Sequence, residues 1–307
     1  MGPEGVHLFD RDTGVNLLLD ELSPAPELWS EAPRFMSFAL TNACELACPY
    51  CYAPKHVARL DSDALAGWAV ELDRAGALGI GFGGGEPTLY PGFAALCHRI
   101  HNETDLALSV TTHGHRWTGA FAASIGGALQ FVRVSMDGTG DTYSRLRGRP
   151  FTAFVERLKV IADRYRFGIN VVVNADTLDE LDTVADFAFG HGAQELLLLP
   201  EVGRDGVSLL DREQQAKLNA WIESNYRSRR LAISAPAAEA VSSPLAPLTI
   251  PGFADRDFLH VDASGLLRVC AYGPASQGIA VPPGSSILDA IRRVRGVAHP
   301  AKREALA

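Results

Sequence analysis

The chain has 307 residues, of which 47% are hydrophobic and 8% aromatic, and it contains 29 glycines and 18 prolines. This composition excludes collagen-like, low-complexity and disordered proteins and predicts a globular chain. The 28 basic and 36 acidic residues give a net charge of −8, which excludes a broad positive field and argues against nucleic acid as the main partner.

No export or membrane signal is visible. Residues 1–6 lack the basic and apolar regions of a secretion signal, and no run of about 18 apolar residues occurs. Three of the five cysteines (Cys44, Cys48 and Cys51) fall within eight positions, a spacing typical of a metal site and unlike a secreted disulfide framework. We therefore expect a soluble, cytoplasmic protein with no membrane partner.

From about residue 34, short β-rich runs alternate with amphipathic helical patterns. The expected strands are 34–40, 78–82, 106–111, 131–136, 168–173 and 195–199. The expected helices are 61–75, 92–101, 118–127, 151–165 and 178–190. This alternation predicts an α/β fold with a parallel sheet and right-handed crossovers. Six units are fewer than a closed barrel needs, so we expect a partial (β/α)6 TIM-like barrel with ligands at the carboxyl ends of its strands.

Shorter segments flank the expected barrel. Residues 1–33 contain two apolar runs around a turn, which predicts a β-hairpin arm packed on the barrel. A helix is expected at about 211–226, followed at 235–251 by a linker or covering loop rich in Ala, Pro and Ser. A second hairpin is expected at 258–269. The expected domains are the arm at 1–33, the barrel at 34–230, and a linker with a small β-rich extension at 231–307.

The clustered cysteines directly follow the first expected strand at CxxxCxxC spacing. They supply one ligand fewer than a closed four-cysteine cluster uses, so one coordination position stays open for a substrate or cofactor. The alternative is a structural zinc site with His56 as the fourth ligand, although the spacing to His56 is irregular for a zinc finger.

Together with further motifs at successive strand ends, this motif resembles the radical S-adenosylmethionine (radical SAM) superfamily over about residues 34–200. In that family three cysteines hold a 4Fe–4S cluster, and SAM binds the unique iron. The resemblance implies one such cluster, held by Cys44, Cys48 and Cys51, and SAM as the second cofactor.

The run GGGEP at 83–87 resembles the family's GGEP element at the end of the second strand. The resemblance implies that Gly84 and Gly85 let the backbone approach SAM and that Glu86 contacts its amino group. Taken alone, the run would be a glycine turn with a solvated glutamate.

Two later motifs also follow strands. Thr-His-Gly at 112–114 lies where many relatives have Thr-Asn-Gly, so His113 either contacts substrate or replaces a turn-capping asparagine. The run 134–138 resembles the family's Ser-x-Asp-Gly, which implies that Ser135, and with less weight Asp137, lies near SAM; an Asp-Gly turn is the alternative. In the Arg-Gly segment that follows, Arg147 is the candidate clamp for the SAM carboxylate, and a solvated basic loop is the alternative.

Four more residues are implied SAM contacts by placement. Asn170 and Asn174, on and after the fifth strand, are candidates for the sulfonium or ribose region. Leu198, in the apolar run 196–199, is expected to place backbone beside the adenine. Tyr50 is expected to add a contact from within the cysteine loop.

The remaining two cysteines have different expectations. Cys97 lies on an amphipathic helix and is expected to be a small buried hydrophobe. The tail around Cys270 resembles a degenerate SPASM or twitch extension of peptide-modifying relatives. Two cysteines are too few for a second four-cysteine cluster, so none is expected. Cys270 is the candidate catalytic residue, as a hydrogen-atom donor or a ligand, with a half-buried strand cysteine as the alternative.

The resemblance implies that an external reductant such as flavodoxin or ferredoxin reduces the cluster, which cleaves SAM to methionine and a 5′-deoxyadenosyl radical that abstracts hydrogen from substrate. We expect an enzyme that tailors a small natural product or a short peptide in a biosynthetic reaction. The alternatives are a peptide maturase that uses a separate recognition partner, and a non-catalytic iron–sulfur or zinc protein.

Overall fold

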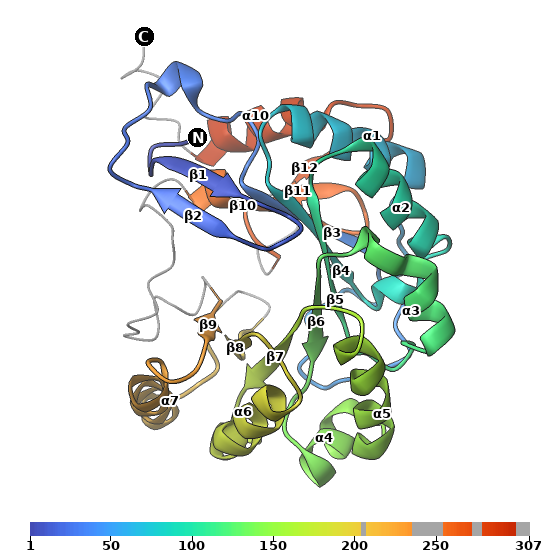
Figure 1. Cartoon of the computed structure of the whole chain (residues 1–307), viewed down its shortest axis with the longest axis vertical. Helices are drawn as coiled ribbons and strands as arrows, with labels where there is room; N and C mark the ends of the chain where they lie inside the picture. The colour runs from blue at the N-terminus through green and yellow to red at the C-terminus, as the bar shows by residue number, and fades with distance from the viewer. Residues whose placement is uncertain (204–206, 235–253, 272–277, 299–307) are drawn as a thin grey trace.

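A single curved sheet forms the centre of the molecule in the computed structural model, which describes residues 1–203, 207–234, 254–271 and 278–298. The sheet has ten strands in the order β12-β11-β10-β3-β4-β5-β6-β7-β8-β9. Figure 1 shows helices α1 to α6 arranged along its outer face. None of the helices in the described part of the chain has the length and apolar character that crossing a membrane requires.

All six strands expected from the sequence are present. They are β3 (Phe35–Thr41), β4 (Gly79–Gly84), β5 (Ala107–Thr112), β6 (Phe131–Ser135), β7 (Phe167–Val173) and β8 (Leu196–Pro200). Neighbours pair in parallel in chain order, which confirms the partial barrel. A seventh parallel strand, β9 (Leu231–Ile233), pairs with β8; three residues show too little periodicity to predict it.

The helices on the outer face are α1 (Ser62–Arg74), α2 (Phe93–Glu103), α3 (Gly119–Ile125), α4 (Gly140–Arg147), α5 (Phe151–Ala162), α6 (Leu181–Gly190) and α7 (Arg212–Asn225). Three of them, α1, α3 and α7, begin at a residue whose side chain caps the helix. Asp61 caps α1 by accepting a hydrogen bond from the Ala64 N–H at 2.9 Å, which satisfies one of the amide groups that a helix start leaves unpaired. The sequence pattern predicts all of these helices except α4.

Strand residues alternate between a helix-facing side and a concave side. On β3 the side chains of Met36, Phe38 and Leu40 are fully buried in the core that the helices cover. On the concave side of β4, a Cβ placed on Gly83 would meet no atom within 4 Å. The large side chains therefore lie on the helix-covered side of the sheet, and the concave side has room for a ligand.

The N-terminal arm forms the expected antiparallel hairpin, β1 (Val6–Phe9) and β2 (Asn16–Leu19). Its turn contacts residues that lie just before barrel strands. The Arg11 guanidinium donates to the carbonyl of Thr104 at 2.7 Å, and Arg166 donates to the carbonyl of Thr13 at 2.6 Å. The arm therefore covers the end of the barrel at which the strands begin.

The C-terminal tail joins the barrel sheet. Its described elements are α9 (Ala254–Asp257), β10 (Phe258–Val261), β11 (Leu266–Arg268), β12 (Ile279–Ala280) and α10 (Ile287–Ala298). β10 and β11 form the expected second hairpin, and β10 also pairs in parallel with β3. The expected linker at 235–251 lies outside the described residues, and the three-part domain division stays a prediction.

Candidate functional site

The three cysteines lie in the loop that follows β3, at the carboxyl edge of the sheet. Each sulfur accepts one N–H hydrogen bond from this chain. Cys44 accepts from the Leu46 amide at 3.4 Å, Cys48 from the Arg147 guanidinium at 3.8 Å, and Cys51 from the Lys55 ammonium at 3.2 Å. Two of the three donors are cationic, and such donors stabilise anionic sulfur, the form that binds metal.

The surroundings of Cys44 favour a cation over a bare thiolate. Burial raises the pKa of Cys44, and the nearby carboxylates of Glu86 and Glu45 raise it further. Negative charge around a thiol disfavours the free anion, and it also stabilises a positively charged metal that displaces the proton. The donor set therefore fits a resident metal group.

The structure does not bring His56 together with the three cysteines, as a zinc site with these four ligands would require. Among the described residues, the one group of three or more potential ligands within reach of a single ion is Cys44, Glu45 and His113, whose ligand atoms lie within 4.8 Å of one another. His56 lies apart from it, with its Nε2 at 3.0 Å from the hydroxyl oxygen of Ser264. Three separate thiols suit a cluster of several irons better, because each cysteine then binds a different iron atom.

The GGEP turn packs directly on the cysteine loop. The amide of Gly85 donates to the carbonyl of Thr41, and the amide of Glu86 donates to the carbonyl of Ala43, both at 2.7 Å. A Cβ on Gly85 would lie 2.2 Å from that Ala43 oxygen. Gly84 adopts a φ of 121°, which a side chain rarely tolerates. Both glycines are thus required for contact between the two loops.

Glu86 is fully buried, and this chain satisfies both of its oxygens. Oε1 accepts from the amide and the hydroxyl of Thr88 and from the hydroxyl of Thr112, at 3.1, 2.6 and 2.8 Å. Oε2 accepts from the His113 amide at 2.9 Å. The carboxylate is therefore held between the GGEP turn and the end of β5, and the solvated glutamate of the alternative reading is absent.

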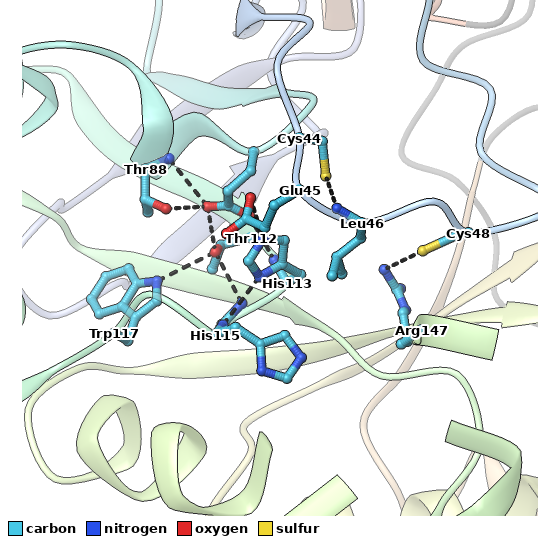
Figure 2. Close-up of polar contacts among 12 residues, drawn as sticks. Cys44, Glu45, Leu46, Cys48, Thr88, Thr112, His113, His115, Trp117 and Arg147 are labelled. Carbon is cyan, nitrogen blue, oxygen red and sulfur yellow. Dashed lines mark hydrogen bonds and ion pairs between the residues drawn. The ribbon is translucent and has the colours of Figure 1, made fainter. Parts of the chain in front are cut away.

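His113 lies between two carboxylates, as the close-up in Figure 2 shows for Glu45. Its Nδ1 accepts from the His115 amide at 3.1 Å, so in the neutral ring the proton is on Nε2. That Nε2 is 3.3 Å from an oxygen of Glu45 and 3.3 Å from Oε2 of Glu86. His113 therefore connects the cysteine loop to the GGEP turn, a role that turn-capping asparagine cannot fill.

A buried ion pair lies on the other side of the cysteine loop. Arg147 Nη2 is 2.5 Å from Oδ2 of Asp137, and these side chains are 10% and 0% exposed. Asp137 also accepts from the Val172 amide at 2.6 Å and from the hydroxyl of Tyr50. Burial and Asp137 raise the pKa of Tyr50, so its hydroxyl stays protonated and donates. Asp137, which the sequence favours less than Ser135, holds this network together.

The remaining residues that the sequence suggests as SAM contacts lie on or after strands β6, β7 and β8. Ser135 and Asn170 are register partners at the carboxyl ends of β6 and β7. Leu198 is fully buried in the core, whereas its neighbours Leu197 and Leu199 are half-buried on the concave side. Asn174 donates to the carboxylate of Glu201 at 2.8 Å.

The two remaining cysteines, Cys97 and Cys270, are not part of the CxxxCxxC loop. Cys97 is fully buried in the core on α2, and burial raises its pKa. Cys270 is a half-buried free cysteine two residues after β11. In the described part of the chain it joins no group of potential metal ligands.

Sequence reasoning gives no role to Glu45 and His115. Glu45 lies between two motif cysteines and His115 lies two residues after His113, so spacing within the motifs is the signal that points to them. The hydroxyl of Tyr143, 2.9 Å from Nε2 of His115, comes from α4. That contact joins residues 28 apart in the chain, which no local pattern reveals.

The Radical SAM superfamily model matches residues 38–188. The chain is 31% identical over 182 residues to the PqqA peptide cyclase of Ruegeria pomeroyi, covering 56% of this chain and 48% of that protein. It is 27% identical over 224 residues to the mycofactocin maturase MftC of Mycolicibacterium smegmatis, covering 66% and 57%. The chain thus spans about half the length of the curated relatives it matches.

Two solved structures share the fold. Streptococcus suis SuiB bound to the precursor peptide SuiA has a TM-score of 0.66 at 13% identity and covers 84% of this chain and 64% of that chain. The anSMEcpe enzyme with bound AdoMet has a TM-score of 0.63 at 16% identity and covers 86% and 80%. The CxxxCxxC loop, the GGEP turn and strands β4 to β7 all lie within the matched residues, and residues 38–188 of the chain are a radical SAM superfamily domain.

Proposed function

We propose that this protein is a radical SAM enzyme that modifies a peptide in a biosynthetic reaction. The observation that carries the proposal is the set of three thiols, each with its own N–H donor, packed against a GGEP turn at the carboxyl edge of the barrel. When bound, a 4Fe–4S cluster and SAM supply a reducing electron and a carbon radical that takes hydrogen from substrate.

The chain's own residues bind and orient these groups. Cys44, Cys48 and Cys51 would hold the cluster, and the N–H groups on their sulfurs would stabilise its negative charge. Glu86 is our candidate for the amino group of SAM. Oε1 already accepts three hydrogen bonds and Oε2 only one, so an ammonium group would bind at Oε2, beside the His113 Nε2 that lies 3.3 Å away.

Other residues shape the reaction space. Ser135 and Asn170 lie at the carboxyl ends of adjacent strands and are our candidates for the ribose and sulfonium region. Arg147 remains a candidate for the SAM carboxylate only if it exchanges part of its contact with Asp137. The N-terminal arm covers the opposite end of the barrel, which limits access of water from that side.

The peptide substrate is favoured over a small natural product by the relatives. Their names include a peptide cyclase, a maturation protein and maturases, and one related structure holds a precursor peptide. A maturase with a separate recognition partner is compatible with the same comparisons. The reductant in our proposal is a flavodoxin or ferredoxin.

The decisive experiment is anaerobic reconstitution of the full chain, followed by SAM and dithionite. We expect about four irons per chain at the loop and formation of 5′-deoxyadenosine. Cys44→Ala should lose both. A fully loaded cluster that yields no deoxyadenosine would leave the non-catalytic iron–sulfur alternative standing, and zinc as the bound metal would support the zinc alternative.

Cys270 is tested separately with the substrate peptide. If it donates a hydrogen atom or ligates a group, Cys270→Ala should change the product or lower the product-forming rate while deoxyadenosine formation continues. An unchanged rate and product would remove Cys270 from the mechanism. Its half-buried position after β11 is compatible with either result.

A further inference from the structure

A cavity of about 580 Å³ lies on the outer side of the cysteine loop, between the first turns of α3 and α5. Three arginines line it: Arg116 after β5, Arg149 before α5, and Arg157 on α5. Glu45 of the cysteine loop forms part of the same wall. Ser135 and Asn170, on the concave side of the sheet, are not among the lining residues. The cavity is therefore separate from the proposed SAM site.

The three arginines of this cavity form no close ion pairs with any described residue and share one carboxylate, that of Glu45. Within the described part of the chain, no ion pair forms at Arg116, Arg149 or Arg157, although neighbouring Arg145 pairs with Asp176 at 3.1 Å. Exposed arginines elsewhere show the same pairing, such as Arg99 with Asp63 at 2.5 Å. In a chain of net charge −8, three guanidinium groups beside a single carboxylate form a local region of opposite sign.

The other ionisable groups at the cavity do not cancel this charge. Burial, followed by the charges of His113 and Arg149, lowers the pKa of His115 to about 4, so the ring is neutral near pH 7. The carboxylate of Glu45 is 3.3 Å from His113 Nε2. Three guanidinium groups therefore face one carboxylate, and the cavity keeps a positive charge that suits carboxylates or another anion.

The cavity wall is close to a cluster ligand. A carboxylate oxygen of Glu45 lies within 4.8 Å of the Cys44 sulfur. Electron transfer slows steeply with distance, so a donor seated at this wall would be near enough to the cysteine loop to reduce a cluster there. Complexes of electron-transfer proteins bury small areas and dissociate readily, which a patch of this size can support.

We propose that this arginine-lined cavity is the docking site for the acidic electron-donor protein, a reduced flavodoxin or ferredoxin whose surface carboxylates pair with Arg116, Arg149 and Arg157. The proposal rests on the proposed function. One electron leaves the donor, which is oxidised by one electron, and reduces the cluster by one; no bond forms or breaks. Because the chain as a whole repels an acidic partner, the local patch determines where it docks.

The test compares two reductants on the reconstituted full chain. Deoxyadenosine formation is measured with dithionite and, separately, with reduced acidic flavodoxin that has been freed of dithionite. In the double variant Arg116→Glu and Arg149→Glu, the flavodoxin-driven rate should fall at least tenfold relative to the dithionite-driven rate. Arg149→Lys should keep most of the flavodoxin-driven rate. In the wild type, that rate should fall steeply with added salt.

Arg230→Glu is the matched control. Arg230 is an exposed arginine at a second cavity of about 450 Å³ beside the start of β8 and β9, and the substitution makes the same change of charge as either single replacement in the double variant, far from the cysteine loop. The ratio of the two rates should stay within about twofold of the wild type, as for surface charges outside an interface.

Direct binding separates the remaining outcomes. Surface plasmon resonance should show flavodoxin binding to the wild type and to Arg230→Glu, with about tenfold weaker binding to the double variant. The proposal is overturned if the double variant keeps its flavodoxin-driven rate, or if both rates fall equally. Tight binding of inorganic phosphate alone, measured by calorimetry and abolished in the double variant, would instead assign the cavity to a small anion. If wild type makes no deoxyadenosine with dithionite, the proposed function fails, and the binding assay still tests docking.

Discussion

The ion pair between Arg147 and Asp137 illustrates how single residues support the cysteine loop. Burial acts to lower the pKa of Arg147, but Asp137, Tyr50 and Cys48 raise it above its ordinary value, so the guanidinium stays charged. The same guanidinium donates to the sulfur of Cys48. A buried charge of this kind is stable only while its partner is present.

We therefore expect Asp137→Asn to lower the free energy of unfolding by about 3 kcal/mol, because it leaves the Arg147 charge buried without a counter-charge. Urea unfolding of the cluster-free protein measures the change. Asp176→Asn is the control, since it breaks the exposed pair with Arg145, and it should cost less than about 1 kcal/mol. Equal losses in the two variants would contradict the argument.

A second residue-scale prediction concerns pH. Burial, followed by the charge of Arg268, lowers the pKa of His260 from 6.5 to about 4. Above about pH 6.5 the group is neutral in both folded and unfolded chains and adds no pH dependence. As pH falls toward 4, the unfolded chain binds the proton first, so stability decreases and then levels off.

At pH 5 we expect this histidine to cost the wild type about 2 kcal/mol of stability relative to pH 7.5. The His260→Asn variant of the cluster-free protein should lose that part of the difference in urea unfolding experiments. His115, whose pKa is also lowered to about 4, adds to the slope of both proteins, so the comparison uses the difference between them. Parallel pH curves for the two proteins would refute the assignment.

At the scale of elements, the GGEP turn and the cysteine loop behave as one unit. Two amide hydrogen bonds join them, and Gly85 permits their close approach. We expect Gly85→Ala to lower the free energy of unfolding by about 1–3 kcal/mol, because the new Cβ must push a backbone carbonyl aside. Iron content after reconstitution should fall with it, since the cysteine loop is displaced.

Gly83→Ala is the matched control for that substitution. It lies two residues earlier, near the end of β4, and a Cβ there meets no atom within 4 Å. Its stability should stay within about 0.5 kcal/mol of the wild type, with unchanged iron content. Similar losses in both variants would show that glycine flexibility, and not contact between the loops, determines the effect.

The sequence predicts elements well where periodicity is long. All six barrel strands are correctly placed, because each is a short β-rich run between two longer helical patterns. Helix α4 escapes prediction because only Tyr143 and Leu146 of its eight residues are buried. The motifs also indicate which loops meet at the site. The sequence does not reveal that Asp137 accepts hydrogen bonds from Tyr50 and Val172, because these residues are 87 and 35 positions away. Such contacts form only when the chain folds, and no pattern of neighbouring residues predicts them.

At the scale of the whole molecule, Arg34 joins the arm, the barrel and the tail. It lies just before β3 and pairs with Glu4 of the arm at 3.6 Å and with Asp257 of the tail. The three side chains are 10%, 8% and 18% exposed. Replacing this arginine therefore removes one charge shared by parts of the chain more than 200 residues apart.

We expect Arg34→Met to lower the free energy of unfolding by about 3 kcal/mol, because two largely buried carboxylates both lose the guanidinium that they share. Guanidinium unfolding and limited proteolysis of the arm provide the measurements. Arg292→Met serves as the control, because Arg292 also connects tail and N-terminal region, through Glu31, but is 55% exposed. It should cost less than about 1 kcal/mol, and a comparable loss would argue that burial is not the cause.

The parallel pairing of β10 with β3 also has a consequence for how the protein is made. During synthesis, residues 35–41 leave the ribosome more than 200 residues before their partner at 258–261. One edge of the nascent sheet therefore stays without hydrogen-bond partners until residues 258–261 have been made, and open edges invite pairing with other chains. Slowing elongation between residues 41 and 258 should increase aggregation of this protein, whereas co-expression of chaperones that shield exposed edges should relieve it.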